Sequence, residues 1–462
     1  MSFPCYPEYK DSGVEWLGEV PGHWEVKALK NVISRIESGV SVNAIDTPAA
    51  EGEIGVLKTS CVYRGWFDPA ENKAVVPEEY ERVACPVTAG TLIVSRMNTP
   101  DLVGAAGMVG ESHPGLFLPD RLWQVHFADA HAAFIHYWTH SPLYRAQVQQ
   151  VCAGASSSMQ NLAQDQFRAF ILALPPAPEQ KSIAAFLDRE TAKIDALVAE
   201  QQNLIALLKE KRQALISHAV TKGLDPDVPM KDSGVAWLGE VPAHWSVGKT
   251  GFYLSIVAGF AFSSAGFSLE QSDAKLLRGI NVGVGRIKWE DVVYWKRVVG
   301  DGLEPYELNV DDLVIGLDRP LITEGVRIAR ISEADLPCLL LQRVAALHPR
   351  SSMHSAYIYY LLASDMFVAH FAPETTGVSV PHISPDQIGQ FVIPIPPLPE
   401  QVEIADHIIS ESEKIEVLMC EAKASIELLQ ERRTALISAA VTGKIDVRHL
   451  AAASAEPTPE PA

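Results

Sequence analysis

An internal repeat at an offset of 221 residues constrains this chain more than any other feature of its sequence. The segment DSGVEWLGEVPGHWEV at 11–26 returns as DSGVAWLGEVPAHWSV at 232–247, with 13 of 16 positions identical. A second pair of segments, 175–224 and 396–445, shares 24 of 50 positions. The chain is therefore a tandem duplication. We call these repeated segments the frame, and the fold must contain the frame twice.

The sequences held between the repeated segments differ from each other. Residues 27–174 and 248–395, which we call the first and second inserts, occupy equivalent places in the repeat. They share little beyond scattered apolar positions. A duplicated enzyme domain would be expected to keep a catalytic signature in one or both inserts. A protein that recognises its ligand with two separate parts would instead keep the repeated segments and vary the surfaces that bind the ligand. This second pattern is the one observed.

Length and composition narrow the class of protein. A chain of 462 residues suits roughly two to four domains of about 100 to 200 residues. No apolar run approaches the roughly 18 residues that span a bilayer, and the first residues lack the pattern of a signal peptide, so we expect a cytoplasmic protein with no membrane partner. The six cysteines are scattered singly, which is typical of reduced structural residues.

Each repeat ends in a stretch that predicts a long helix. Residues 179–221 contain no proline or glycine and are rich in Ala, Leu, Glu, Lys and Gln. Apolar residues recur along one face in both copies, so the two helices are expected to pair as an antiparallel coiled coil of about 60 Å. A long helix packed on its own domain is the alternative. The predicted stripes are Ile183, Leu187, Ile194, Leu197, Ile205, Leu208 and Leu215, and Ile404, Ile408, Ile415, Leu418, Ile426, Leu429 and Leu436.

The inserts have the pattern of mixed α/β (α+β) domains. β-rich pieces at 52–67 and 91–97, and at 275–289 and 312–317, are separated by turn-forming residues, and a more helical piece follows at 131–150 and 352–371. The predicted organisation is a first α/β domain with its frame segment at 1–174, a spacer helix region at 175–224, a second α/β domain at 225–395, a second spacer region at 396–445 and a disordered tail at 446–462.

The repeated DSGVEWLGEVPGHWEV segment, the PPAPEQ and PPLPEQ helix openings and the ALIS-AVT helix ends resemble the specificity (S) subunit of type I restriction-modification systems. The resemblance covers nearly the whole chain. It implies that two variable target recognition domains each read one half of a split site in double-stranded DNA, separated by paired spacer helices. It also implies partners: two methyltransferase (M) subunits, which would hold S-adenosylmethionine and methylate adenine, and nuclease/translocase (R) subunits. No cofactor is expected on this chain itself.

The chain carries only weak signatures of catalysis, cofactor binding or metal binding. There is no Asn-Pro-Pro-Tyr-type tetrapeptide and no GxxxxGK[ST] loop, so no catalytic site is predicted. Gly283 and Gly285 form an isolated G-x-G that we interpret as a turn. The repeated His23 and His244 lie far from other metal ligands in the sequence, which favours a structural role and no metal site.

Cations and amides at loop positions are the candidates for DNA contact. The net charge of −19 requires such contact to be local or shared with a partner, because DNA-binding surfaces replace phosphate counterions. Each insert carries a charge of only about −4, so most of the acidic excess lies outside the inserts. The predicted DNA-binding residues are Lys58, Arg64, Arg96, Asn98, Thr99, Arg121 and Gln160 in the first insert and Arg278, Arg286, Lys288, Arg319 and Arg343 in the second.

Four tryptophans of the repeated segment are predicted to pack each insert onto the spacer or to dock a methyltransferase subunit. They are Trp16, Trp24, Trp237 and Trp245. Two other functions remain open at this point. One is a duplicated coiled-coil scaffold without DNA contact, and the other is an enzyme with an unrecognised site.

Overall fold

The computed structural model describes residues 3–152, 159–375 and 381–449, and these fall into two compact units. Unit 1 contains the described residues up to 201 and from 424 onward, and unit 2 contains those from 202 to 423. The two long helices, α4 (Ala177–Lys222) and α8 (Leu398–Val441), each contribute residues to both units. Among the described residues, no helix combines the length and apolar character that crossing a membrane requires.

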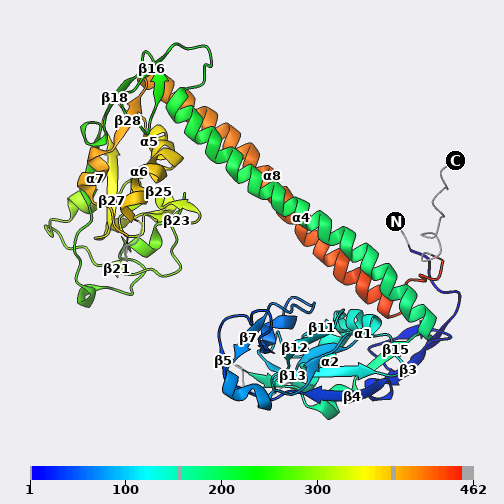
Figure 1. Cartoon of the computed structure of the whole chain (residues 1–462). Coiled ribbons are helices and arrows are strands. Elements are labelled where there is room, and N and C mark those ends of the chain that lie inside the picture. Colours follow the sequence, from blue (N-terminus) through cyan, green and yellow to red (C-terminus); the bar gives the residue numbers. More distant parts are fainter. Residues whose placement is uncertain (1–2, 153–158, 376–380, 450–462) are drawn as a thin grey trace, which may run out of the picture. The chain divides into compact units, whose positions relative to one another are not determined.

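Unit 1 is built on two sheets packed with short helices. A four-stranded antiparallel sheet has the order β11-β9-β13-β4, and a five-stranded mixed sheet has the order β5-β7-β6-β12-β8 (Figure 1). The strand LIVS (β9) is buried along its whole length, as expected for a continuous apolar run in the centre of a sheet. The bounds are β4 Ile33–Ser38, β5 Ala44–Ile45, β6 Gly55–Leu57, β7 Asn72–Val75, β8 Pro86–Val87, β9 Leu92–Ser95, β11 Ala106–Met108, β12 His113–Phe117, β13 Leu122–Phe127, α1 Ala132–Thr139, α2 Pro142–Cys152 and α3 Gln164–Ala169.

Unit 2 repeats this architecture. Its four-stranded sheet has the order β19-β27-β22-β25, which matches β4-β13-β9-β11 strand for strand, and a second sheet has the order β21-β20-β26. The two inserts therefore share one fold despite their different sequences, and the prediction of mixed α/β (α+β) domains is confirmed. The bounds are β19 Leu254–Ala258, β20 Ala274–Leu277, β21 Tyr294–Trp295, β22 Leu313–Gly316, β25 Ile328–Arg330, β26 Cys338–Leu340, β27 Val344–Pro349, α5 Ser355–Leu362, α6 Asp365–Thr375 and α7 Pro385–Gln390.

Short strands of the repeated segments close each insert at its base. The strand that enters an insert pairs antiparallel with the strand that leaves it, so both ends of the insert meet at the start of a long helix. A small hairpin precedes each of these pairs. The closing pairs are β3 Glu25–Ala28 with β15 Ile171–Leu174 and β18 Ser246–Lys249 with β28 Val392–Ile395; the hairpins are β1 Tyr9–Asp11 with β2 Glu19–Pro21 and β16 Met230–Asp232 with β17 Glu240–Pro242.

The long helices α4 and α8 confirm the prediction of paired spacer helices. In unit 2, Leu208 packs with Ile415 and Met419, whereas Ile216, about two turns further along α4, shares a cluster with Ile404. The pairing is therefore antiparallel (Figure 1). Ion pairs flank this seam within each unit, from Arg212 to Glu416 at 3.4 Å and from Arg433 to Asp195 at 3.0 Å.

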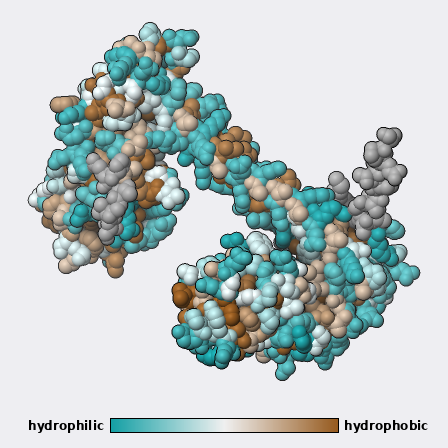
Figure 2. All heavy atoms as spheres, in the orientation of Figure 1, coloured by the Kyte–Doolittle hydropathy of each residue, from teal (hydrophilic) through white to brown (hydrophobic). Residues whose placement is uncertain are grey.

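One position of the predicted stripe is wrong in both copies. Leu197 and the equivalent Leu418 are 45% and 47% exposed. The residues that turn inward lie one position later, at the partly buried Val198 and the buried Met419. A spacing of three residues after Ile194 or Ile415 leaves the narrow a/d seam, and a spacing of four returns to it. Hydrophobic side chains accordingly appear on the outer surface of the helical pair (Figure 2).

The beginning of the predicted tail is also wrong. Asp446 and Val447 are 4% and 0% exposed and pack in unit 1, where the Asp446 amide donates to the carbonyl of Pro4 at 2.8 Å. Both apolar residues of the KIDV sequence, Ile445 and Val447, join the core, which a boundary drawn from the repeat length did not anticipate. Residues 450–462 of the predicted tail lie outside the described residues.

Candidate nucleic-acid interface

A groove of about 1600 Å³ opens in unit 2 between α4 and three loops of the insert. The loops follow strands β20, β22 and β26. Seven lining residues are basic and four are acidic, so the groove is locally positive in a chain whose net charge is −19. The basic residues are Lys209, Arg212, Arg286, Lys288, Arg319, Arg327 and Arg343.

The strand pairing explains why these three loops meet. Strands β20 and β26 are parallel neighbours, so their carboxyl ends, at Leu277 and Leu340, lie at the same edge of their sheet. Strand β22 runs antiparallel to β27, which places its last residue, Gly316, opposite the first residue of β27, Val344. The chain passes from β26 into β27 at this edge, so the loops after β20, β22 and β26 come together there.

Four of the five predicted residues of the second insert line this groove. Arg286, Lys288 and Arg319 have no side-chain hydrogen bond or ion pair to any residue that the structure describes, and Arg286 and Arg319 are exposed. Arg343 lies 3.6 Å from Asp318 and is 61% exposed. The groove thus presents several cations toward solvent.

Two of these arginines stand in a backbone conformation that is uncommon for residues other than glycine. The φ angles of Arg319 and Arg343 are 46° and 73°. The Arg319 amide donates to the carbonyl of Pro381 at 2.6 Å, and the amide of Leu317 donates to the carbonyl of Arg343 at 2.9 Å. Such conformations are retained where surrounding contacts enforce them, and they often accompany binding sites.

The fifth predicted residue, Arg278, is placed differently. Its guanidinium is largely buried and pairs with Asp291 at 2.9 Å, and it does not line the groove. The structure therefore gives Arg278 a partner within the fold.

Arg327 holds two of the groove loops together and was missed by sequence reasoning. Its Nε donates to the carbonyl of Val282 at 2.9 Å, and its Nη1 donates to the carbonyl of Asp318 at 2.9 Å. Burial lowers the pKa of this guanidinium. The Asp318 carboxylate in turn contacts the ring of His382 at 2.7 Å. These contacts fix the loops on which Arg286 and Arg319 stand.

The G-x-G of the second insert is a turn, as predicted. The Gly283 amide donates to the carbonyl of Arg286 at 2.9 Å, and Val282 pairs with Ile287 across the turn. Gly285 has a φ of 70°, which a side chain would strain. The glycines therefore shape the loop that carries Arg286.

Unit 1 has the equivalent edge. Strands β6 and β12 are parallel neighbours and β9 runs antiparallel to β13, so the loops after β6, β9 and β12 meet as they do in unit 2. The predicted residues Arg64, Thr99 and Arg121 are exposed on these loops.

The other predicted residues of unit 1 are engaged within the fold. The Lys58 ammonium pairs with Asp46 at 3.3 Å, and Arg96 Nε donates to the carbonyl of Asp120 at 2.8 Å. Gln160 is half-buried in the strand β14 (Gln160–Asn161), which pairs with β10 (Met97–Asn98).

Asn98, expected at an exposed loop position, is instead buried. It is 7% exposed, and its amide donates to Tyr63 Oη at 2.8 Å and to Ser95 Oγ at 3.1 Å. Its position in β10, opposite Gln160, turns the amide inward. The residue therefore stabilises the loop after β9.

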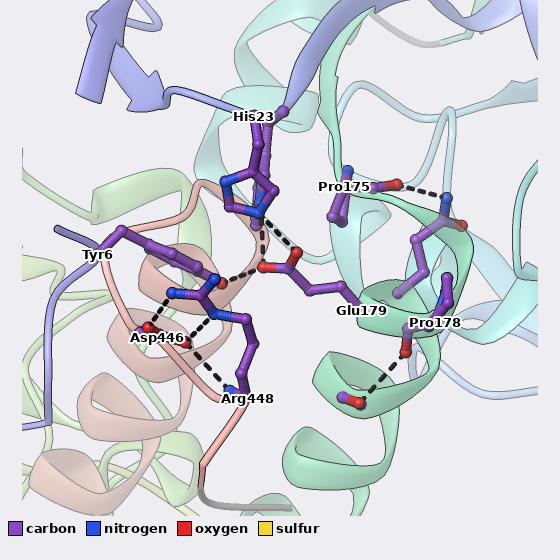
Figure 3. A network of polar contacts seen from close by, with 10 residues as sticks. Tyr6, His23, Pro175, Pro178, Glu179, Asp446 and Arg448 are labelled. Carbon is purple, nitrogen blue, oxygen red and sulfur yellow. Dashed lines mark hydrogen bonds and ion pairs between the residues drawn. The ribbon is translucent and has the colours of Figure 1, made fainter. Parts of the chain in front are cut away.

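The repeated histidine and tryptophan of the frame converge on one carboxylate in each unit. Trp24 Nε1 donates to Glu179 Oε1 at 3.1 Å, and His23 Nε2 lies 2.7 Å from Glu179 Oε2 (Figure 3). In unit 2, Glu400 makes the same contacts, at 3.0 Å to Trp245 and 2.8 Å to His244. We call each of these groups of a tryptophan, a histidine and a glutamate a clamp. These contacts tie both histidines to the long helices, and the glutamate of each PEQ motif joins the frame to the start of its helix.

The clamp of unit 1 has an additional layer. The hydroxyl of Tyr6 donates to Glu179 Oε1 at 2.5 Å, and the Arg448 guanidinium, paired with Asp446 at 2.6 Å, lies over the Tyr6 ring (Figure 3). Burial and the neighbouring Glu179 carboxylate raise the pKa of Tyr6. Glu179 is 6% exposed and Glu400 is 26% exposed, so the clamp of unit 1 is the drier of the two.

The other two predicted tryptophans occupy equivalent positions but differ in their surroundings. Trp237 stacks on Phe391 with ring centroids 5.0 Å apart and an interplanar angle of 10°. Trp16 is 44% exposed. Trp237 therefore packs the frame onto its insert, while Trp16 leaves an aromatic surface in solvent.

Comparison with known proteins identifies related chains. Residues 136–206 and 306–427 match the family model described as the type I restriction modification DNA specificity domain. The specificity subunit of the type I restriction enzyme MjaVIII from Methanocaldococcus jannaschii is 28% identical over 60% of this chain and 62% of its own length. The EcoAI specificity subunit from Escherichia coli is 31% identical over 48% of this chain and 37% of its own length. The chain thus spans less than two thirds of either relative.

Longer matches exist at lower identity. The putative MjaX specificity subunit from M. jannaschii is 21% identical over 94% of this chain and 96% of its own. The crystal structure of the HsdS subunit from Thermoanaerobacter tengcongensis covers 92% of this chain and 98% of its own, with a TM-score of 0.51 and 16% identity. A chain from a structure of complex assembly and conformational transition in the type I R-M system gives a TM-score of 0.63, also at 16% identity, over 91% of this chain and 98% of that one. These structures support the duplicated fold.

Proposed function

We propose that this chain, which belongs to the specificity-subunit family of type I restriction-modification systems, reads a bipartite site in double-stranded DNA and positions partner subunits on it. Each insert would read one half-site with the loops that meet at its sheet edge. The paired helices α4 and α8 would set the length of the unread gap.

One observation carries the proposal. The groove of unit 2 gathers seven basic residues, four of which stand on strand-end loops (Arg286, Lys288, Arg319 and Arg343), in a chain whose net charge is −19. Cations and hydrogen-bond donors grouped on rigid loops suit phosphates and base edges. The acidic excess on the rest of the chain suits coverage by a protein partner.

We further propose that methyl transfer and cleavage belong to partner subunits. The curated relatives are named specificity subunits of type I restriction enzymes, which supports a role within a larger complex. Two methyltransferase subunits, carrying S-adenosylmethionine and modifying adenine, and nuclease/translocase subunits are the expected partners in the cytoplasm. The exposed Trp16 is a candidate contact for one of them.

Exchange of the first insert tests this proposal against its rivals. Residues 27–174 would be replaced by the equivalent insert of a related specificity subunit, and methylated positions would be mapped with the cognate methyltransferase subunit present. One half of the methylated sequence should change, while the other half and the gap stay the same. A change in both halves, or in neither, would overturn the proposal that each insert recognises its own half-site.

The same complex and the purified chain also distinguish the proposed function from two alternatives, a scaffold without DNA contact and an enzyme with its own site. A scaffold without DNA contact predicts no shift of duplex DNA even when the methyltransferase subunit is present. An enzyme with its own site predicts methyl transfer or cleavage by the purified chain alone. The proposal predicts a shift in the complex and neither reaction from the chain by itself.

A further inference from the structure

Two exposed isoleucines lie in the basic groove of unit 2. Ile280 is 64% exposed and Ile322 is 40% exposed, and both line the groove among its cations. Each isoleucine therefore presents aliphatic surface to whatever occupies the groove.

The isoleucines stand on different loops that are tied together. Ile280 belongs to the loop after β20, and Ile322 belongs to the strand β23 (Leu321–Ile322), which pairs with β24 (Gly325–Val326) as a two-stranded hairpin. Arg327 bridges these loops through the carbonyls of Val282 and Asp318. The amide of Gly285 also donates to the carbonyl of Ile328 at 2.9 Å, just beyond the hairpin. The two aliphatic groups are thus held by a common framework.

The hairpin has the form of an element that enters the major groove. A two-stranded ribbon fits the width of that groove. The turn residues of this hairpin, Thr323 and Glu324, are exposed together with Ile322. Arg286 and Arg319, which have no side-chain partner among the described residues, stand beside the hairpin in the same groove.

The major groove offers one apolar group at the base edges, the 5-methyl group of thymine. The minor groove offers no methyl group, and apolar side chains that enter it act as wedges between base steps. The ribbon geometry and the neighbouring exposed guanidinium groups of Arg286 and Arg319 favour the major groove.

We propose that Ile280 and Ile322 contact thymine methyl groups, so that the half-site read by the second insert contains thymine at the positions they face. This inference rests on the proposed function and specifies its chemistry. Recognition then combines hydrogen bonds from the arginines with apolar contacts that reject cytosine, which lacks the methyl group.

Deoxyuridine provides a direct test, because it keeps the base pairing of thymine and lacks only the methyl group. The half-site would first be mapped from methylation of a randomised duplex library by the complex with its methyltransferase subunit. Cognate duplexes would then be made with deoxyuridine in the second half-site only. Binding by the unaltered complex should weaken about fourfold for each contacted methyl group.

Substitutions identify the residues responsible. Ile280→Ser and Ile322→Ser should weaken binding to the thymine duplex and abolish or reduce the penalty for deoxyuridine. Val299→Ser is the matched control, because Val299 is an exposed aliphatic residue of the same unit that does not line the groove, and it should keep the full penalty. The deoxyuridine measurement on the unaltered complex does not depend on the folding of any variant.

The outcomes are distinct. A second half-site without thymine, or an unaltered complex that binds both duplexes equally, would overturn the inference while leaving the proposed function intact. Isoleucine variants that lose affinity equally for both duplexes would also overturn it, and would favour a wedge or a protein contact. Failure of the complex to bind any duplex in a manner that depends on the second insert would instead refute the proposed function.

Discussion

The indole Nε1 of Trp24 lies 3.1 Å from the carboxylate of Glu179, joining the frame before the first insert to the first turn of α4. Glu400 and Trp245 repeat this contact at 3.0 Å. Because each carboxylate also accepts a contact from the neighbouring histidine, both inserts are anchored to their helices by the same group of side chains.

Removal of Glu179 is expected to destabilise unit 1. Glu179→Ala leaves the buried Trp24 indole and the Tyr6 hydroxyl without an acceptor, which should lower the free energy of unfolding by about 2 to 3 kcal/mol. Glu400→Ala should cost less, because Glu400 is 26% exposed. Urea denaturation followed by tryptophan fluorescence measures both. The exposed Glu200 on the same helix gives the control variant Glu200→Ala, and an equal loss in that control would contradict the clamp.

Shortening both long helices together is expected to change the gap and keep the half-sites. Deletion of 202–205 from α4 and of 423–426 from α8 removes about one turn, or about 6 Å, from each helix. Arg212 with Glu416 in unit 2 and Asp195 with Arg433 in unit 1 have the same register, and equal deletions from both helices keep that register in each unit. The permitted gap should shrink by roughly two base pairs at about 3.4 Å each. Methylation of a library with varied gaps measures this, and an unchanged gap would show that the helices do not set it.

Arg319→Ala is expected to weaken base discrimination in the second half-site. Its exposed guanidinium has no side-chain partner among the described residues, so a base contact should be worth roughly 1 to 3 kcal/mol at one base pair. Arg96→Ala, in unit 1, should mainly reduce stability, because that side chain supports the carbonyl of Asp120. Binding to a panel of single-base variants separates the two effects. Uniform weakening by Arg319→Ala across the panel would indicate a phosphate contact instead.

Lys288→Ala is expected to reduce the salt dependence of binding. Each phosphate neutralised by a lysine adds about 0.9 to the slope of log K against log salt concentration on duplex DNA. Removal of Lys288 from the groove should therefore lower the slope by about 1. Lys296→Ala is the control, since Lys296 is exposed in the same unit and does not line the groove. Equal slopes for the two variants would place Lys288 away from DNA.

Unit 1 is expected to lose stability in acid through His140. Burial lowers the pKa of His140 from 6.5 to about 3, so between these values the unfolded chain binds a proton that the folded chain does not. The free energy of unfolding is therefore unaffected by His140 above about pH 6.5, and it decreases as the pH falls from 6.5 toward 3. His140→Phe should flatten this dependence in urea titrations at a series of pH values. The exposed His218 supplies the control His218→Phe, which should retain the acid dependence of the unaltered chain.

Repetition and periodicity made the scaffold predictable from sequence. Helix α4 begins at Ala177 and ends at Lys222, within two residues of the predicted 179–221, because an unbroken run without proline or glycine has few other conformations. The strands LIVS and LVIG and the helical pieces after them were also anticipated. The prediction that Leu197 and Leu418 face the partner helix was wrong, because helical spacing places an apolar residue only approximately on the contact line between two helices.

The candidate interface was predictable only in part. Strand ends indicated Arg286, Lys288, Arg319 and Arg343, since polar loops follow buried strands. Nothing local distinguishes those from Asn98, whose burial depends on Tyr63 from a distant loop. The groove also takes Lys209 from α4, Gln342 from the loop after β26 and the brace residue Arg327. Their proximity arises from parallel pairing of β20 with β26, which sequence periodicity does not reveal.

The hydrogen bond from the Asp446 amide to the Pro4 carbonyl bears on how the polypeptide could be cut and rejoined. Near the start and the end of the described chain, α8 meets the first frame segment much as α4 runs on into the second. In the order of the connections, each long helix thus leads to the frame segment of the other repeat. A rearranged gene that joins residue 449 to residue 3 by a short linker and opens the chain between 223 and 230 would encode the same set of pairings.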